Sequence, residues 1–112
     1  MSDASNWSST SLPSDAAETW KQLLRNDSFV AGRYRLQVAE DDPQQPHDLD
    51  EIYYVISGSA HIEVAGDRRP VRAGELIFVP AHAPHRFVEV TEPLDILVVF
   101  AAARPPGDPQ PR

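Results

Sequence analysis

The stretch DPQQPHDLDEIYYVISG, residues 42–58, decides how this chain is expected to fold. His47 and Glu51 stand four residues apart, a spacing that puts two side chains on one face of either a helix or a strand. Pro46 favours extended backbone, and the run after Glu51 is aromatic and β-branched. We therefore predict a strand that directs an imidazole and a carboxylate into the interior, where a charge must be paired or bound to a cation.

The remaining sequence is typical of an all-β protein. Alternating apolar residues predict a half-buried strand from residue 33 to 39, and short strands follow to residue 100. Ser57-Gly58-Ser59 and Thr91-Glu92-Pro93 are predicted to separate strands as turns, and Gly66-Asp67 to close a hairpin. About seven or eight short strands without intervening helices indicate a sandwich or small barrel and exclude a doubly wound α/β sheet.

One helix is expected ahead of the strands, over residues 15–25, where apolar residues recur at helical spacing. Asp15 and Glu18 resemble a capping box at its start. A chain of 112 residues forms one domain, which we place at residues 14–103. Residues 1–13 are polar and the tail 104–112 is rich in proline, so both are predicted to be disordered.

Composition narrows the function classes. The chain has no cysteine, which excludes disulfides, iron–sulfur clusters and thiol catalysis. Its net charge of −7 opposes binding to the phosphates of nucleic acids. The N-terminus has neither the basic start nor the apolar core of a signal peptide, and no run is long and apolar enough for a membrane span. We therefore expect a soluble, cytoplasmic protein.

A second histidine joins the pair in the opening stretch. His85 precedes a predicted strand, and Pro80 and Pro84 stiffen the approach to it. Two imidazoles and one carboxylate form a set that suits Fe(II) and that Zn, Mn and Ni also accept. The alternative is that His47 and His85 are ordinary loop histidines and Glu51 is solvated, and these residues alone leave both interpretations open.

Residues 34–100 resemble the cupin superfamily, whose members are small jelly-roll β-barrels with two signature motifs. The first motif ends in a histidine, a glutamate after three residues and a glycine after six more, and His47, Glu51 and Gly58 match it. The second contains a glycine, a proline after five residues and a histidine, and Gly74, Pro80 and His85 stand at those spacings. Together the matches indicate a small single-domain cupin, an all-β jelly-roll barrel.

The resemblance implies that His47, Glu51 and His85 bind a divalent metal ion, Fe, Zn, Mn or Ni. The sequence departs from the family pattern at the first motif histidine, which is Gln45, and at the glycine after the proline, which is His82. Gln45 is a candidate fourth ligand or a residue just outside the ligands. His82 is a weaker candidate, because a side chain at such a turn more often faces solvent.

The resemblance also limits the function. It implies a metal-dependent oxygenase, isomerase or decarboxylase acting on a small anionic or oxygen-rich metabolite, but assigns no catalytic residue. A module that binds or senses a small ligand without turnover is the alternative, and a barrel acting only through its surface is the third. A homodimer is expected, since Trp7, Leu12 and Trp20 offer apolar surface near the predicted helix. No nucleic acid or membrane partner is expected.

Overall fold

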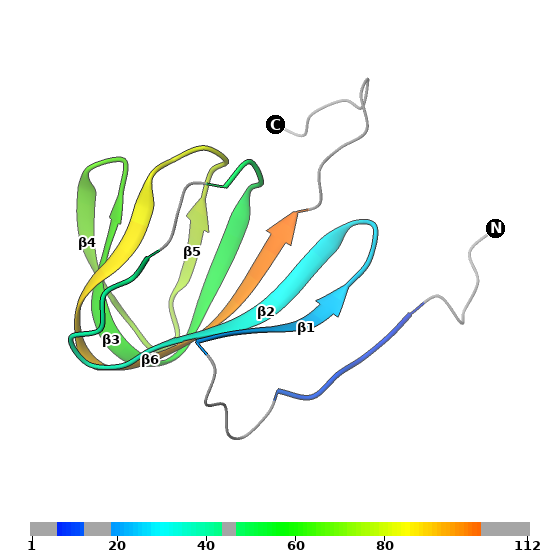
Figure 1. The fold of residues 1–112 in the computed structure, drawn as a ribbon, viewed down its shortest axis with the longest axis horizontal. Coiled ribbons are helices and arrows are strands. Elements are labelled where there is room, and N and C mark those ends of the chain that lie inside the picture. Colours follow the sequence, from blue (N-terminus) through cyan, green and yellow to red (C-terminus); the bar gives the residue numbers. More distant parts are fainter. Residues whose placement is uncertain (1–6, 13–18, 44–46, 102–112) are drawn as a thin grey trace.

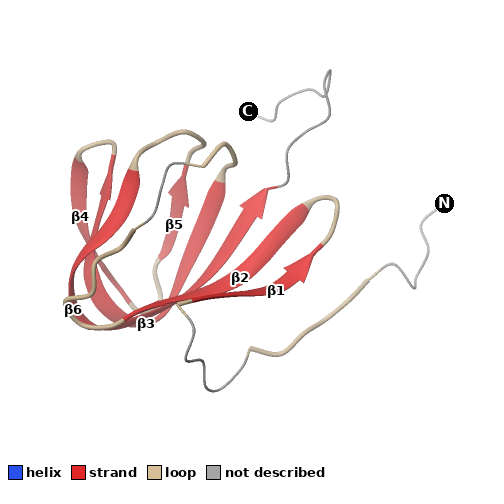
Figure 2. Cartoon of the chain, in the orientation of Figure 1, coloured by secondary structure: helices blue, strands red, loops and turns tan. Residues whose placement is uncertain are grey.

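Six strands form the fold in the computed structural model, which describes residues 7–12, 19–43 and 47–101. They are β1 (Trp20–Arg25), β2 (Phe29–Leu36), β3 (Glu51–Val64), β4 (Asp67–Arg72), β5 (Leu76–Val79) and β6 (His85–Ala101). Their antiparallel order is β1-β2-β6-β3-β4, and β5 pairs with the beginning of β3. Figure 2 shows strands and loops only, so the described ranges contain no helix that could cross a membrane.

Strands β3 and β6 form one long ribbon that is bent in its middle (Figure 1). The ladder pairs Glu51 with Phe100 at one end and Val64 with His85 at the other. A straight strand with the 14 residues of β3 would span about 45 Å, at about 3.3 Å per residue. Register shifts between Val55 and His61 interrupt the ladder, and the ribbon folds over on itself there. Its two halves become the two walls of a jelly-roll barrel.

Gly58 lies at the bend, where two requirements exclude a side chain. Its φ is +100°, a conformation that residues with a Cβ rarely adopt. A Cβ placed on Gly58 would also lie 2.1 Å from the carbonyl oxygen of Pro93 on the neighbouring strand. The glycine that was predicted to end a strand instead allows a continuous strand to turn a corner. Residues 91–93 were likewise predicted to be a turn between two strands, and they instead lie inside the continuous strand β6.

The core fills the space between the two walls. The wall of β2, β5, the beginning of β3 and the end of β6 contributes buried residues such as Leu36, Val55 and Ile96. The other wall contributes Ile62 from the end of β3 and Phe87 from the beginning of β6. These positions alternate with more exposed ones along each strand, as in any sheet with one buried face. The all-β jelly-roll prediction is confirmed.

The predicted helix over residues 15–25 is wrong in its second half. Residues 20–25 form β1, which pairs with β2 from Trp20–Tyr34 to Arg25–Val30. Pairing to an adjacent strand outweighs the helical propensity of Lys, Gln, Leu and Arg. Residues 15–18 lie outside the described residues, as do 1–6 and the tail 104–112 that were predicted to be disordered. Residues 7–12 have no regular secondary structure.

Candidate metal centre and adjoining pocket

His47, Glu51 and His85 come together at one end of the barrel. One potential ligand atom from each of the three lies within 4.8 Å of the other two. Glu51 begins β3 and His85 begins β6, so the two residues stand at opposite ends of the bent ribbon. The fold closes that separation, because Nε2 of His85 lies 2.7 Å from Oε1 of Glu51. The ribbon's bend therefore assembles the cluster.

Two short loops hold the histidines in place. The backbone N–H of His82 donates to the carbonyl of His47 over 2.6 Å. The N–H of Ala81 donates to the Asp50 carboxylate over 2.8 Å. These bonds join the loop before β3 to the loop before β6, and the imidazole rings of His47 and His85 lie 5.5 Å apart. The two loops that carry His47 and His85 are thus tied directly to each other.

Glu51 is a buried carboxylate without an ordinary partner. Its side chain is 1% exposed, and neither oxygen has a partner with hydrogen-bond geometry within the described ranges. The imidazole of His85 is the ionisable group beside it, with Nε2 close to Oε1 but outside hydrogen-bond geometry. A buried carboxylate is costly unless it is paired or bound to a cation. The donor set of two imidazoles and one carboxylate therefore fits a divalent metal ion.

The orientation of His85 also suits a ligand. Its Nδ1 lies 2.8 Å from the carbonyl oxygen of Ala83, which can only accept, so Nδ1 carries a proton and donates. Such a bond fixes the ring and leaves Nε2 for a metal ion. The neighbouring Glu51 carboxylate, with the Ala83 carbonyl, raises the pKa of His85 above its ordinary value, although burial opposes this.

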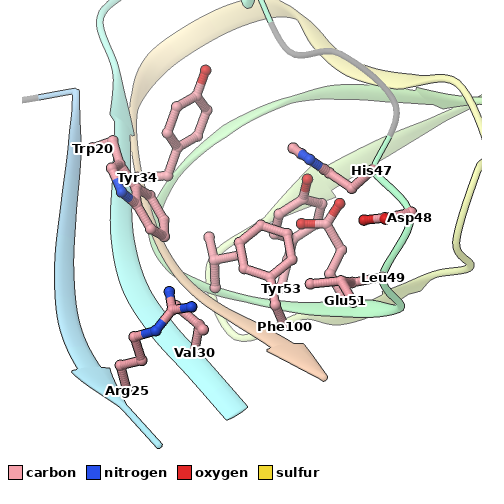
Figure 3. Close-up of a pocket in the computed structure, with 11 residues that line it drawn as sticks. Trp20, Arg25, Val30, Tyr34, His47, Asp48, Leu49, Glu51, Tyr53 and Phe100 are labelled. Carbon is pink, nitrogen blue, oxygen red and sulfur yellow. The ribbon is translucent and has the colours of Figure 1, made fainter. Parts of the chain in front are cut away.

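A pocket of about 430 Å³ opens beside the cluster (Figure 3). Most of its wall is apolar and comes from the inner faces of β1, β2, β3 and β6. Its lining residues are Trp20, Arg25, Val30, Tyr34, His47, Asp48, Leu49, Glu51, Tyr53, Val98 and Phe100. The volume falls in the usual range for small-molecule sites, about 300–1,000 Å³. A molecule in the pocket would contact His47 and Glu51 directly.

Several predicted placements can be compared with the structure. Tyr53 and Phe87 are buried in the barrel, and Tyr53 also forms part of the pocket wall. His82 is exposed and is not among the clustered residues. Its φ of +69° explains why a glycine suits this position in the family pattern. Gln45 lies outside the described residues.

Asp42 stands at the end of an acidic loop, residues 40–42, and differs from its two exposed neighbours. Asp42 is buried and accepts hydrogen bonds from the Tyr34 hydroxyl over 2.5 Å and from the Phe87 N–H over 2.8 Å. Burial, together with this carboxylate, raises the pKa of Tyr34 far above its ordinary value. Trp20 and Arg25 were missed as pocket residues, because β1 was predicted to be a helix. Residues 20–25 carry no apolar–polar alternation that would have indicated a strand.

Comparison with known proteins agrees with this architecture. Residues 32–100 match the family described as Cupin domain. An uncharacterized protein of Streptomyces coelicolor is 40% identical over 80 residues, which cover 71% of this chain and 76% of that protein. A putative mannose-6-phosphate isomerase from Ralstonia eutropha has a solved structure with 31% identity and a TM-score of 0.67, covering 82% of this chain and 92% of that one. An RmlC-like cupin from Methanocaldococcus jannaschii has a TM-score of 0.75 at 15% identity, covering 87% and 92%, and shows the fold alone.

Proposed function

Because the chain belongs to the cupin family, we propose that it binds a divalent metal ion through His47, Glu51 and His85. In this proposal the ion holds a small anionic or oxygen-bearing molecule in the adjoining pocket. The observation that carries it is the convergence of three ligand atoms within 4.8 Å around a buried carboxylate that lacks a hydrogen-bond partner among the described residues. Three protein ligands leave coordination positions for a substrate.

The chemistry that such an ion supplies is Lewis-acid polarisation of a bound oxygen, or oxygen activation if the ion is iron. The protein's own residues supply the rest. The Ala83 carbonyl fixes the His85 ring, and the apolar wall around Tyr53 and Phe100 excludes water from the bound molecule. A relative named as a putative mannose-6-phosphate isomerase agrees with a small-metabolite role but does not define the substrate.

The second candidate function is binding without turnover. Among the described lining residues outside the cluster, Asp48 is the one carboxylate, beside the guanidinium of Arg25 and the phenols of Tyr34 and Tyr53. The Tyr34 hydroxyl donates to Asp42, and its raised pKa keeps it protonated, so it is unsuited to act as a base. Asp48, which is exposed at the pocket, remains as a proton acceptor. Turnover that is lost in Asp48→Asn with unchanged ligand affinity would support the enzyme over the binding module.

Metal content is the direct test. Protein purified without a tag or chelator should contain close to one divalent ion per chain by elemental analysis, and His47→Ala/His85→Ala should contain almost none. The matched control is His61→Ala/His82→Ala, which removes two imidazoles outside the cluster. If wild-type protein is empty and takes up no added Fe, Zn, Mn or Ni, the proposal fails. It also fails if the control loses as much metal as the cluster variant.

We also propose a homodimer, formed through the outer face of β3 and β5. Four large apolar side chains are exposed there in two cross-strand pairs, Ile52 with Phe78 and Tyr54 with Leu76. A patch of exposed apolar side chains is typical of an interaction surface. The net charge of −7 opposes self-association through most of the surface, whereas a twofold contact here sets uncharged residues against their copies. Trp20, expected to contribute, instead lines the pocket.

A further inference from the structure

We infer that the pocket accepts a single-ring aromatic carboxylic acid rather than a sugar or sugar phosphate. This inference rests on the proposed function, because an oxygen substituent at the far end of the acid would face His47, Glu51 and His85. It names the substrate class, which the three candidate metal ligands alone leave open. The reasons lie in the aromatic wall, in the small number of free polar groups and in the position of Arg25.

The first reason is the aromatic wall. Trp20, Tyr53 and Phe100 line the pocket together with Val30 and Val98. Trp20 meets Phe100 edge to face, with ring centroids 6.2 Å apart and an interplanar angle of 67°. Flat apolar surfaces of this kind favour stacking and edge contacts with another ring. Apart from the indole N–H of Trp20 and the hydroxyl of Tyr53, the side chains of this wall offer no hydrogen-bonding group to a sugar.

Gly32 holds this wall in place. A Cβ on Gly32 would lie 2.1 Å from the six-membered ring of Trp20, so the indole occupies the space where a side chain would stand. Trp20 therefore lies flat on β2 and faces the pocket because residue 32 has no side chain. The tryptophan is 39% exposed, and the exposed part includes pocket surface. The wall is thus built by a specific pair of residues on adjacent strands.

The second reason is the lack of free polar groups. The Tyr34 hydroxyl is bound to Asp42. Apart from the candidate metal ligands, the charged residues in the described lining are Arg25 and Asp48. A sugar has several hydroxyl groups, and each one buried without a partner loses its hydrogen bonds to water.

Arg25 provides the third reason. Figure 3 shows its guanidinium beside Val30, across the pocket from His47 and Glu51. The structure gives Arg25 no ion pair within the described part of the chain. A guanidinium binds a carboxylate through two parallel hydrogen bonds, a geometry that suits a planar acid. A ligand lying along the aromatic wall can therefore meet Arg25 with its carboxylate and the metal cluster with an oxygen on the opposite side of its ring.

The experiment uses 4-hydroxybenzoate as the probe, with 4-hydroxybenzamide and mannose 6-phosphate for comparison. The chain has two tryptophans, so a ¹⁵N spectrum contains two indole signals, and Trp7→Phe assigns them. With zinc-loaded protein, 4-hydroxybenzoate should shift the Trp20 signal and leave Trp7 unchanged. The neutral amide should bind at least about tenfold more weakly, because it lacks the charge-assisted bond to Arg25. Mannose 6-phosphate should leave the Trp20 signal unchanged.

Arg25→Gln should weaken 4-hydroxybenzoate binding by about tenfold and leave the amide's affinity unchanged, with Arg69→Gln, an exposed arginine on β4, as the control. The inference is overturned if mannose 6-phosphate binds as tightly, if Arg25→Gln has no effect, or if no acid shifts the Trp20 signal. Metal uptake is measured on the same samples. If the protein takes up metal but binds no acid, the aromatic-acid inference fails and the proposed metal binding stands. If the acid binds in a way that depends on Arg25 but the protein takes up no metal, the inference is supported and the proposed function fails.

Discussion

Replacing Gly58 by alanine tests whether the bend in the β3–β6 ribbon holds the residues of the candidate metal centre together. The new methyl group would lie 2.1 Å from the Pro93 oxygen and 2.8 Å from the Cα of Leu94, both backbone atoms. Rotating a side chain cannot relieve these contacts. The two strands must separate or the bend must open, and either change moves Glu51 away from His85.

Two contributions set the size of the effect. A residue with a Cβ at positive φ costs about 1–2 kcal/mol. Separating the strands loses hydrogen bonds worth about 1 kcal/mol each, so the free energy of unfolding should fall by about 3–5 kcal/mol in total. For a domain of this size that corresponds to a decrease in Tm of at least about 12 °C. The total stability of such domains is only about 5–15 kcal/mol, so part of the protein should remain folded.

Gly74→Ala is the matched control. Gly74 has a similar φ of +92°, but a Cβ there has no atom within 4 Å. Its cost should be confined to about 1–2 kcal/mol of backbone strain. Urea unfolding measures both stabilities, and calorimetric titration with zinc measures the affinity of the folded fraction, which should fall in Gly58→Ala and stay unchanged in Gly74→Ala. Equal stability losses in the two variants would refute the close approach as the cause.

Three further perturbations follow from the contacts. Burial raises the pKa of Asp95, but the hydrogen bonds and charges of Arg33 and Arg35 together lower it more, so the net pKa lies below the ordinary value and the ionised form stabilises the fold. Asp95→Asn should therefore lose about 1.5–3 kcal/mol at pH 7, and this difference from wild type should shrink as the pH falls below about 4, measured by urea unfolding at pH 7 and pH 3. Phe78→Glu should convert the proposed dimer to a monomer in light scattering, and a monomeric wild type would contradict the interface. Asp42→Ala should cost about 1–3 kcal/mol by thermal unfolding, because the Phe87 N–H loses its partner, and an unchanged Tm would contradict that role.

The three residues of the candidate metal centre could be predicted from the sequence because their signals are local. The spacing of His47 and Glu51 and the prolines before His85 describe strand entrances, and the structure brings these three residues together. The bend could not be predicted in the same way. Gly58 has the sequence signature of a turn, and whether such a glycine ends a strand or bends it depends on Pro93, thirty-five residues away. Long-range pairing decides between the two.

The pocket was harder to predict than the cluster. The helical spacing of Trp20 and its neighbours is real, but β2 offers an edge to which this segment pairs, and pairing determines its structure. Once β1 is a strand, Trp20 faces Gly32 and Arg25 reaches the pocket. The burial of Asp42 could not be predicted for a related reason, because only the folded barrel brings Tyr34 and Phe87 to the same carboxylate.

If the three clustered residues bind an ion, its place between the two ends of one ribbon would link metal supply to protein lifetime. An ion bound to Glu51 and His85 would act as a clasp, because the ribbon cannot open at Gly58 while both ends remain attached to it. Unfolding would then have to wait for the ion to leave, so the ion would slow the unfolding rate more than it speeds folding. Proteases that cleave the opened chain would find it mainly after metal has been lost. A cell short of the metal would therefore clear this protein first in its empty form.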